Sequence, residues 1–204
     1  MITISGSAES SAVIKKSKFF GFAHRVDSEA QAQTILEQHR KKHHDATHNC
    51  FAYVLQSGEM RYSDDGEPQG TAGLPMLDVI RKGGLTDVLV ISTRYFGGTL
   101  LGAGGLVRAY TQSAADALAA AQKVQVIACS VLICTFSYHD WALAEKKLTD
   151  AGFMIDSVDY AGDVSVTIAA LPGAEDELQT LVTNISQGKT APAPQGTRNI
   201  ERPV

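Results

Sequence analysis

One uninterrupted apolar run places the strongest constraint on the fold of this chain. Residues 87–93 read Asp-Val-Leu-Val-Ile-Ser-Thr between turn-forming residues, which is the pattern of a β-strand covered on both faces. Five glycines follow between positions 97 and 105, and residues 106–121 then carry apolar side chains at helical spacing. The centre of the chain therefore predicts a buried strand, a glycine-rich turn and a helix, in that order.

The sequence before this strand predicts a hairpin, a helix and a further strand. Residues 10–26 contain two short apolar runs separated by a lysine-rich segment, which is typical of two strands joined by a basic turn. Ser28 opens a candidate capping box in front of a helix that ends in the cations and histidines of 40–44. Residues 49–56 are rich enough in β-branched and aromatic side chains to form a strand.

The pattern restarts after the central helix. Residues 126–188 predict the order strand, helix, strand, strand, helix, which matches most of a split βαβ, ferredoxin-like unit. Whether a last strand completes this unit stays open, because Pro192 and Pro194 lie where that strand would pair. We therefore predict an α+β protein with two domains, at 1–122 and 126–188, followed by a proline-containing tail at 189–204.

Composition excludes several classes of protein. With 204 residues, of which 44% are hydrophobic and 20% charged, the chain is neither disordered nor collagen-like nor a coiled coil. It contains no apolar run of membrane-spanning length and no secretory leader, so we expect a cytoplasmic protein with no membrane partner. The three cysteines, Cys50, Cys129 and Cys134, form no disulfide framework and are expected to be free thiols.

The charge is distributed unevenly along the chain. Residues 1–121 hold twelve basic and twelve acidic side chains, whereas residues 122–204 hold six and ten and so carry the whole net charge of −4. Five of the six histidines also lie in the first part. A globally basic nucleic-acid-binding protein is thereby excluded, but a local basic surface on the first domain is not.

Three dense polar stretches lie in the first domain. They read Asp-Ala-Thr-His-Asn-Cys at 45–50, Ser-Asp-Asp-Gly-Glu-Pro-Gln-Gly-Thr-Ala-Gly at 63–73, and Arg-Tyr-Phe-Gly-Gly-Thr-Leu-Leu-Gly-Ala-Gly-Gly-Leu-Val-Arg-Ala-Tyr at 94–110. In this order and spacing they closely resemble the IMPACT/YigZ family, whose two signatures correspond to the second and third stretches. The resemblance extends more weakly from about residue 15 to about residue 188.

The resemblance implies a fold and a role in translation. It implies a first domain of the ribosomal-protein and elongation-factor domain IV type, containing a left-handed βαβ crossover, and a second domain similar to domain V of elongation factor G. Eukaryotic members of the family regulate translation by restraining activation of an amino-acid-starvation kinase, and they carry an additional N-terminal interaction domain that this sequence does not contain. The resemblance supplies no catalytic residues.

The glycine-rich turn is the first candidate binding site. A strand, a glycine turn and a helix N-terminus present backbone N–H groups to an anion, and an arginine on each side of the turn suits a phosphate clamp. The turn is neither a P-loop nor a clean dinucleotide-binding fingerprint, and glycines suit close packing equally well. The candidate anion-binding residues are Arg94, Gly97, Gly98, Gly102, Gly104, Gly105 and Arg108.

Other polar residues of the first domain are candidates for accessory roles. The carboxylates at 64–67 suit either magnesium ligands or a rigid turn in which they accept from nearby N–H groups, and we favour the turn. For His48 we favour a structural role with a hydrogen bond over the role of a base that activates Cys50. Tyr95 lies beside an arginine, as on base-stacking surfaces or in a core. The accessory candidates are Lys15, Lys16, Lys18, His48, Asp64, Asp65, Glu67 and Tyr95.

These patterns predict a non-enzymatic protein that binds RNA or a ribosome-associated factor and acts in translation or stress regulation, with no cofactor. Two alternatives stay open. One is a small hydrolase that acts on a phosphate-containing substrate through Asp64, Asp65, Glu67 and His48, and the other is a protein-interaction module based on the acidic second domain. Charge placement separates them, because RNA binding needs cations on one surface, whereas a hydrolase needs carboxylates that converge in a cleft.

We expect no tightly bound metal ion. His43, His44, His48 and Cys50 lack the spacing of a zinc site, and neighbouring side chains such as the first two point to different faces of a helix. Elemental analysis of protein purified without chelator should find no stoichiometric zinc, and chelator should leave the melting temperature unchanged. One equivalent of retained metal would contradict this prediction and favour the hydrolase.

Overall fold

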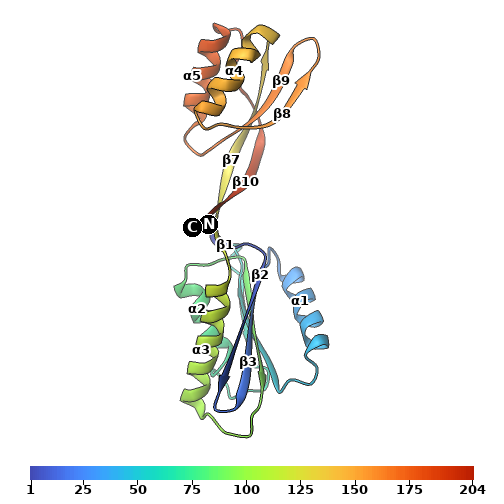
Figure 1. Ribbon diagram of the computed structural model, residues 1–204, viewed down its shortest axis with the longest axis vertical. Helices are drawn as coiled ribbons and strands as arrows, with labels where there is room; N and C mark the ends of the chain where they lie inside the picture. Colours follow the sequence, from blue (N-terminus) through green and yellow to red (C-terminus); the bar gives the residue numbers. More distant parts are fainter. The chain divides into compact units, whose positions relative to one another are not determined.

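Each half of the chain forms its own sheet and helices in the computed structural model, which describes residues 1–204 (Figure 1). One unit comprises Met1–Gln125 with Pro203–Val204, and the other comprises Val126–Arg202. Both units mix strands with helices, so the predicted two-domain α+β fold is confirmed. No helix in either unit is both long enough and apolar enough to cross a bilayer.

The first unit contains a five-stranded antiparallel sheet in the order β2-β3-β6-β4-β5. The strand β6 lies at the centre of this sheet, and its residues from Val88 to Arg94 are all buried, as the apolar run predicts. The five strands span Ser7–Ile14 (β2), Ser17–Arg25 (β3), Val88–Tyr95 (β6), His48–Val54 (β4) and Met60–Ser63 (β5).

Helices cover both faces of this sheet (Figure 1). On one face, α1 (Glu29–Lys42) packs Leu36 into a cluster with Leu89 and Ile91 of β6. On the other face, α2 (Gly73–Lys82) and α3 (Ala103–Ala120) enclose Val88 and Val90. Because successive side chains of β6 enter opposite apolar layers, its sequence is continuously apolar rather than alternating.

The chain crosses this sheet twice, with opposite handedness. The crossover β3-α1-β4 passes over β6, and the crossover β5-α2-β6 passes over β4 on the other face. In each crossover the two strands are parallel, because both are antiparallel to the strand between them. Compared with the first crossover, the strands of the second run in the opposite direction. The second crossover also moves across the sheet in the opposite direction and places its helix on the opposite face. It therefore has the opposite hand, and one of the two crossovers is left-handed, as the family resemblance implies.

The second unit has the strand order of a ferredoxin-like fold, β10-β7-β9-β8, with α4 and α5 packed together on the sheet (Figure 1). Trp141 and Leu148 of α4 and Val182 of α5 share one core with Val166 and Ile168 of β9. The elements span Lys123–Phe136 (β7), Tyr138–Asp150 (α4), Met154–Tyr160 (β8), Val164–Ala170 (β9), Glu175–Ser186 (α5) and Ala193–Pro203 (β10).

Two features of this unit differ from the expected boundaries. The segment expected as a tail at 189–204 contains β10, which pairs with β7. The prolines permit this because β10 is an edge strand, Pro192 precedes it and Pro194 lies at its beginning, where a missing N–H is tolerated. In addition, β7 begins at Lys123 and pairs there with the short strand β1 (Ile2–Ile4), so a strand rather than a free linker follows the first domain.

A stacked pair of histidines at the C-terminal end of α1 makes stability depend on pH. His39 is 7% exposed, its Nε2 lies 2.7 Å from Thr93 Oγ1, and its ring lies 4.5 Å from that of His43. Burial and the neighbouring His43 lower the pKa of His39 from 6.5 to about 4. The unfolded chain therefore takes up this proton as the pH falls through 6.5, whereas the folded protein takes it up only near pH 4.

We expect the free energy of unfolding to decrease between pH 6.5 and 4, with a limiting contribution from His39 of about 1.4 kcal/mol per pH unit. The variant His39→Gln, which retains a hydrogen-bonding side chain, should flatten this dependence. Urea denaturation at a series of pH values measures the effect, and His44→Gln, at an exposed position, is the control. Identical pH dependence in His39→Gln and the parent would contradict the assignment.

Candidate nucleic-acid interface

Two lysines form the tip of the β2–β3 hairpin. Because β2 ends at Ile14 and β3 begins at Ser17, Lys15 and Lys16 make a two-residue turn, and their φ angles are 45° and 66°. Such turns favour Asn and Gly, since L side chains lose about 1–2 kcal/mol per residue in the left-handed conformation. Both lysines are exposed, so this turn gives up stability and presents two positive charges.

Glycine at position 97 allows the segment after β6 to pack against this hairpin. A Cβ atom there would lie 2.0 Å from the carbonyl carbon and oxygen of Lys16. Ser17 is fully buried beside it, and its Oγ accepts hydrogen bonds from Gly97 N at 3.2 Å and from Arg94 Nη2 at 3.3 Å. This glycine of the predicted anion site is therefore required for close packing.

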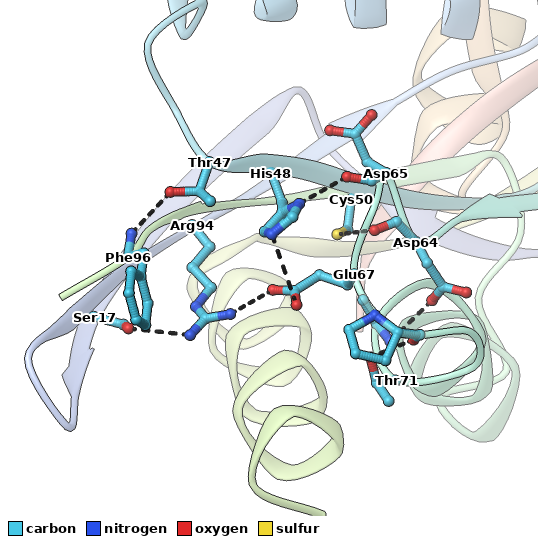
Figure 2. Close-up of polar contacts among 12 residues, drawn as sticks. Ser17, Thr47, His48, Cys50, Asp64, Asp65, Glu67, Thr71, Arg94 and Phe96 are labelled. Carbon is cyan, nitrogen blue, oxygen red and sulfur yellow. Dashed lines mark hydrogen bonds and ion pairs between the residues drawn. The ribbon is translucent and has the colours of Figure 1, made fainter. Parts of the chain in front are cut away.

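A buried ion pair lies behind the hairpin (Figure 2). Arg94 Nη1 is 2.7 Å from Glu67 Oε1, and the two side chains are 6% and 3% exposed. Tyr110 donates its hydroxyl hydrogen to the same carboxylate oxygen at 2.7 Å. The guanidinium also lies over the rings of Phe19 and Phe96. Arg94 thus lies inside the domain rather than on the surface where a phosphate clamp was expected.

The remaining residues of the glycine-rich turn surround the start of α3. Gly98 and Gly102 have φ angles of 79° and 74°, which glycine adopts without strain. Gly102 is the N-cap of α3 and supplies no side-chain hydrogen bond, while Gly104 is exposed and Gly105 half-buried. Arg108 is exposed further along the helix. The expected strand, turn and helix are present, but one flanking arginine is buried and the other is exposed.

The carboxylates of residues 64–67 point in different directions. Asp64 accepts from three backbone N–H groups at and before the start of α2, at 2.8–3.0 Å. Asp65 accepts from Asn49 N at 2.6 Å, and Glu67 pairs with Arg94. The predicted rigid turn is confirmed, including the positive φ of the glycine that follows Asp65. No cluster of three or more His, Cys, Asp or Glu side chains has the arrangement of a metal site.

His48 is held in one orientation by the same turn. Its Nδ1 lies 2.8 Å from the carbonyl oxygen of Asp65, which can only accept, so Nδ1 carries the hydrogen. In the neutral ring Nε2 is then an acceptor, and it faces Glu67 Oε2 at 3.8 Å (Figure 2). The predicted structural role of His48 is confirmed, but its Nε2 and the facing carboxylate oxygen have no donor between them.

Cys50 does not form a nucleophilic pair with His48. Its Sγ donates to the carbonyl oxygen of Asp64 at 3.0 Å, and the residue is fully buried. Burial raises the pKa of the Cys50 thiol far above its ordinary value. The thiol therefore stays protonated near neutral pH, whereas nucleophilic catalysis requires the thiolate.

Phe96, whose side chain is 46% exposed, lines two cavities. The first has a volume of about 430 Å³, a polar floor of His48, Glu67 and Arg94, and apolar walls that include Leu100 and Leu106. This volume is in the range of small-ligand pockets. The second, of about 530 Å³, lies beside the hairpin and is lined by Lys16, Lys18, Phe20, His43, Asp45, Tyr95 and Phe96.

Basic and aromatic side chains gather around the second cavity. Tyr95 packs edge-on against Phe20 with 5.9 Å between ring centroids, and its hydroxyl donates to Asp45 at 3.2 Å. This juxtaposition of lysines and half-exposed rings is the arrangement expected of a base-stacking surface. We call Lys15, Lys16, Lys18, Phe20, Tyr95 and Phe96 the lysine–aromatic surface.

Three residues of the site were not among the candidates from the sequence. Thr47 Oγ1 accepts from Phe96 N at 2.9 Å and so positions that ring, and the residue lies in the first polar stretch, which was a usable signal. Leu100 is 81% exposed, and an apolar residue inside a glycine-rich turn was a second signal. Ser17 lies between lysines in a hairpin, where nothing in the pattern indicates its buried hydrogen bonds.

Comparison with known proteins gives a consistent result for both units. The model of the Impact N-terminal domain matches residues 15–118, and a domain of unknown function, DUF1949, matches residues 134–189. The IMPACT family member YvyE of Bacillus subtilis is 34% identical, covering 92% of this chain and 88% of that protein. YigZ of Escherichia coli is also 34% identical, covering 86% and 88%. A crystal structure of a hypothetical protein is 29% identical, covers 96% and 97%, and has a TM-score of 0.60.

Removing the buried cation should destabilise the first unit strongly. Arg94→Ala leaves Glu67 buried without its charge partner, which costs about 3–5 kcal/mol. The matched control is Arg61→Ala, because Arg61 Nη1 also lies 2.7 Å from a carboxylate oxygen of Glu29, but these side chains are 59% and 46% exposed. That variant should lose little or no stability, because exposed ion pairs contribute almost nothing measurable. Urea denaturation compares the two, and similar small losses would argue against a structural role for the Arg94–Glu67 pair.

Proposed function

This chain belongs to the IMPACT family, and we propose that it binds RNA through the lysine–aromatic surface and acts in translation. The observation that carries this proposal is the hairpin turn, where two lysines occupy left-handed positions that favour Asn and Gly. A turn that gives up stability in order to present charge is evidence of a functional demand at that place. The eukaryotic family members that the sequence resembles regulate translation, which supports the same field of action.

The charges of the surface are available to phosphates. Lys15, Lys16 and Lys18 are all exposed, and none of them forms an ion pair with a carboxylate. Lysines that neutralise phosphates release counterions from the nucleic acid, and this release supplies much of the binding free energy. The first-turn amides of α3 have no side-chain cap and offer a further phosphate contact.

The rings of the surface suit unpaired bases. Phe96 is 46% exposed, and it lies next to Tyr95 at the end of β6. Stacking of a base on an aromatic ring contributes about 1–3 kcal/mol and tolerates any sequence. Because double helices keep their bases stacked inside, this combination of rings and lysines favours single-stranded RNA as the ligand.

The polar residues of the same domain do not favour the hydrolase. Asp64 caps α2, Asp65 holds the start of β4, and Glu67 neutralises a buried arginine. Each carboxylate therefore has a structural partner, and the three do not converge in one cleft.

For the acidic second unit, the exposed and stacked rings of Tyr138 and Tyr160 are the candidate surface for a protein partner.

A substitution in the hairpin separates binding from folding. Lys15→Asn combined with Lys16→Gly creates the preferred two-residue turn, so we expect the double variant to be more stable by about 1 kcal/mol. It lacks two positive charges of the parent, and its affinity for single-stranded RNA should decrease. The slope of log K against log salt should become shallower by about 0.7 for each phosphate that the variant no longer neutralises.

The matched control is Lys146→Gln with Lys147→Gln, which removes two exposed charges from α4 in the second unit. Binding to a labelled single-stranded RNA, followed by fluorescence anisotropy over a range of salt concentrations, should be unchanged in this control. Equal loss of affinity in both double variants would contradict the assignment of the surface. Absence of RNA binding by the parent at low salt would contradict the function itself.

A further inference from the structure

When His48 is neutral, its Nε2 and Glu67 Oε2 are two hydrogen-bond acceptors that face each other in the 430 Å³ cavity with no donor between them. Glu67 Oε1 accepts from both Arg94 and Tyr110, but Oε2 of the same carboxylate accepts from no group. His48 Nε2 lies 3.8 Å from Oε2, which is beyond hydrogen-bond distance. The Glu67 side chain is 3% exposed and lines the cavity, so this oxygen is an acceptor available to a ligand there.

The floor also contains the Arg94 guanidinium, which pairs with Glu67 and whose Nε is buried without a partner and closed to solvent. The complement of the two acceptors is a pair of neighbouring hydroxyl groups, each of which donates one hydrogen. An ammonium group would add a positive charge beside the guanidinium, while a carboxylate or phosphate group has no donor for the two acceptors.

The walls define what is attached to these hydroxyls. The guanidinium of Arg94 lies over the Phe96 ring at 5.4 Å, and the ring is 46% exposed, which leaves surface for an aromatic group of the ligand. Phe96 also lines the second cavity, together with Lys16 and Lys18. A ligand with a diol in the first cavity, a planar base on this ring and a phosphate near the lysines of the second cavity therefore matches the whole arrangement.

We propose that this cavity binds the 2′,3′-cis-diol of a ribonucleotide, with the hydroxyls donating to Glu67 Oε2 and His48 Nε2 and the base stacked on Phe96. Within RNA only the 3′-terminal residue has both hydroxyls free, because internal residues carry a phosphodiester on the 3′ oxygen. The ligand is thus either the 3′ end of an RNA strand or a free nucleotide. Binding of an RNA 3′ end rests on the proposed function, whereas binding of a free nucleotide does not.

The test varies the ligand rather than the protein. A short RNA labelled at its 5′ end is prepared with a terminal ribose and, for comparison, with a terminal 2′,3′-dideoxyribose. Since hydrogen bonds to a charged group are among the stronger ones, the ribose end should bind about tenfold more tightly. Equal affinities of the two RNAs would overturn the 3′-end site while leaving RNA binding through the lysine–aromatic surface intact.

Free nucleotides distinguish this inference from the proposed function. Adenosine 5′-monophosphate should bind to the protein, and its 2′,3′-dideoxy analogue should bind about tenfold less tightly. If this preference is observed while RNA does not bind, the proposed function fails and the diol site stands. If neither the RNAs nor the two nucleotides show a preference for the diol, the site is excluded.

Two variants locate the diol in the cavity. His48→Asn retains an amide hydrogen near the Asp65 carbonyl but removes the Nε2 acceptor, so the preference for the terminal ribose should decrease, with only the bond to Glu67 Oε2 remaining. Phe96→Leu should weaken both RNAs equally, while Tyr138→Leu, at another exposed ring, should change neither. Melting temperatures establish that each variant is folded. An unchanged ribose preference in a folded His48→Asn protein would overturn the assignment of this floor, and if the variant does not fold, the ligand comparisons on the parent decide.

Discussion

The carboxylate of Glu67 is the point at which separate parts of the first unit meet. It lies in the loop between β5 and α2 and accepts from Arg94 of β6 and from Tyr110 of α3. Arg94 in turn reaches Ser17 at the start of β3. Because desolvating both charges is offset only when these contacts form together, the pair fixes the loop, the helix and the hairpin relative to one another. The lysine tip and the cavity floor both depend on this arrangement.

Most polar motif residues of this domain are used by the fold itself. Asp64, Asp65 and Glu67 each complete a hydrogen-bond or charge requirement of the scaffold, and burial keeps the Cys50 thiol protonated. The groups that the fold itself does not use are the exposed lysines, one half-exposed ring and a few atoms at the floor of a cavity. The RNA binding and the diol binding that we propose depend on those groups.

Much of the fold was predictable because local patterns determine it. The apolar run at 87–93 predicts the central strand, and the lysine-rich segment before Val26 predicts the hairpin. The burial of Arg94 was not predictable, because its partner Glu67 is 27 residues away and nothing in the local sequence indicates their contact. The strand β10 stayed open at the sequence level, because the rule against proline in strands does not apply at a sheet edge, and edges are set by tertiary structure.

The position of β6 determines the order in which the first sheet is completed. The hairpins β2–β3 and β4–β5 each join strands that are adjacent in the sequence, so they require only local closure. Their inner strands, β3 and β4, do not touch each other, because β6 lies between them. During synthesis the ribosome releases both hairpins before it releases β6. Without β6 the facing edges of β3 and β4 have no partner, so the two hairpins cannot join into one sheet before that strand is available.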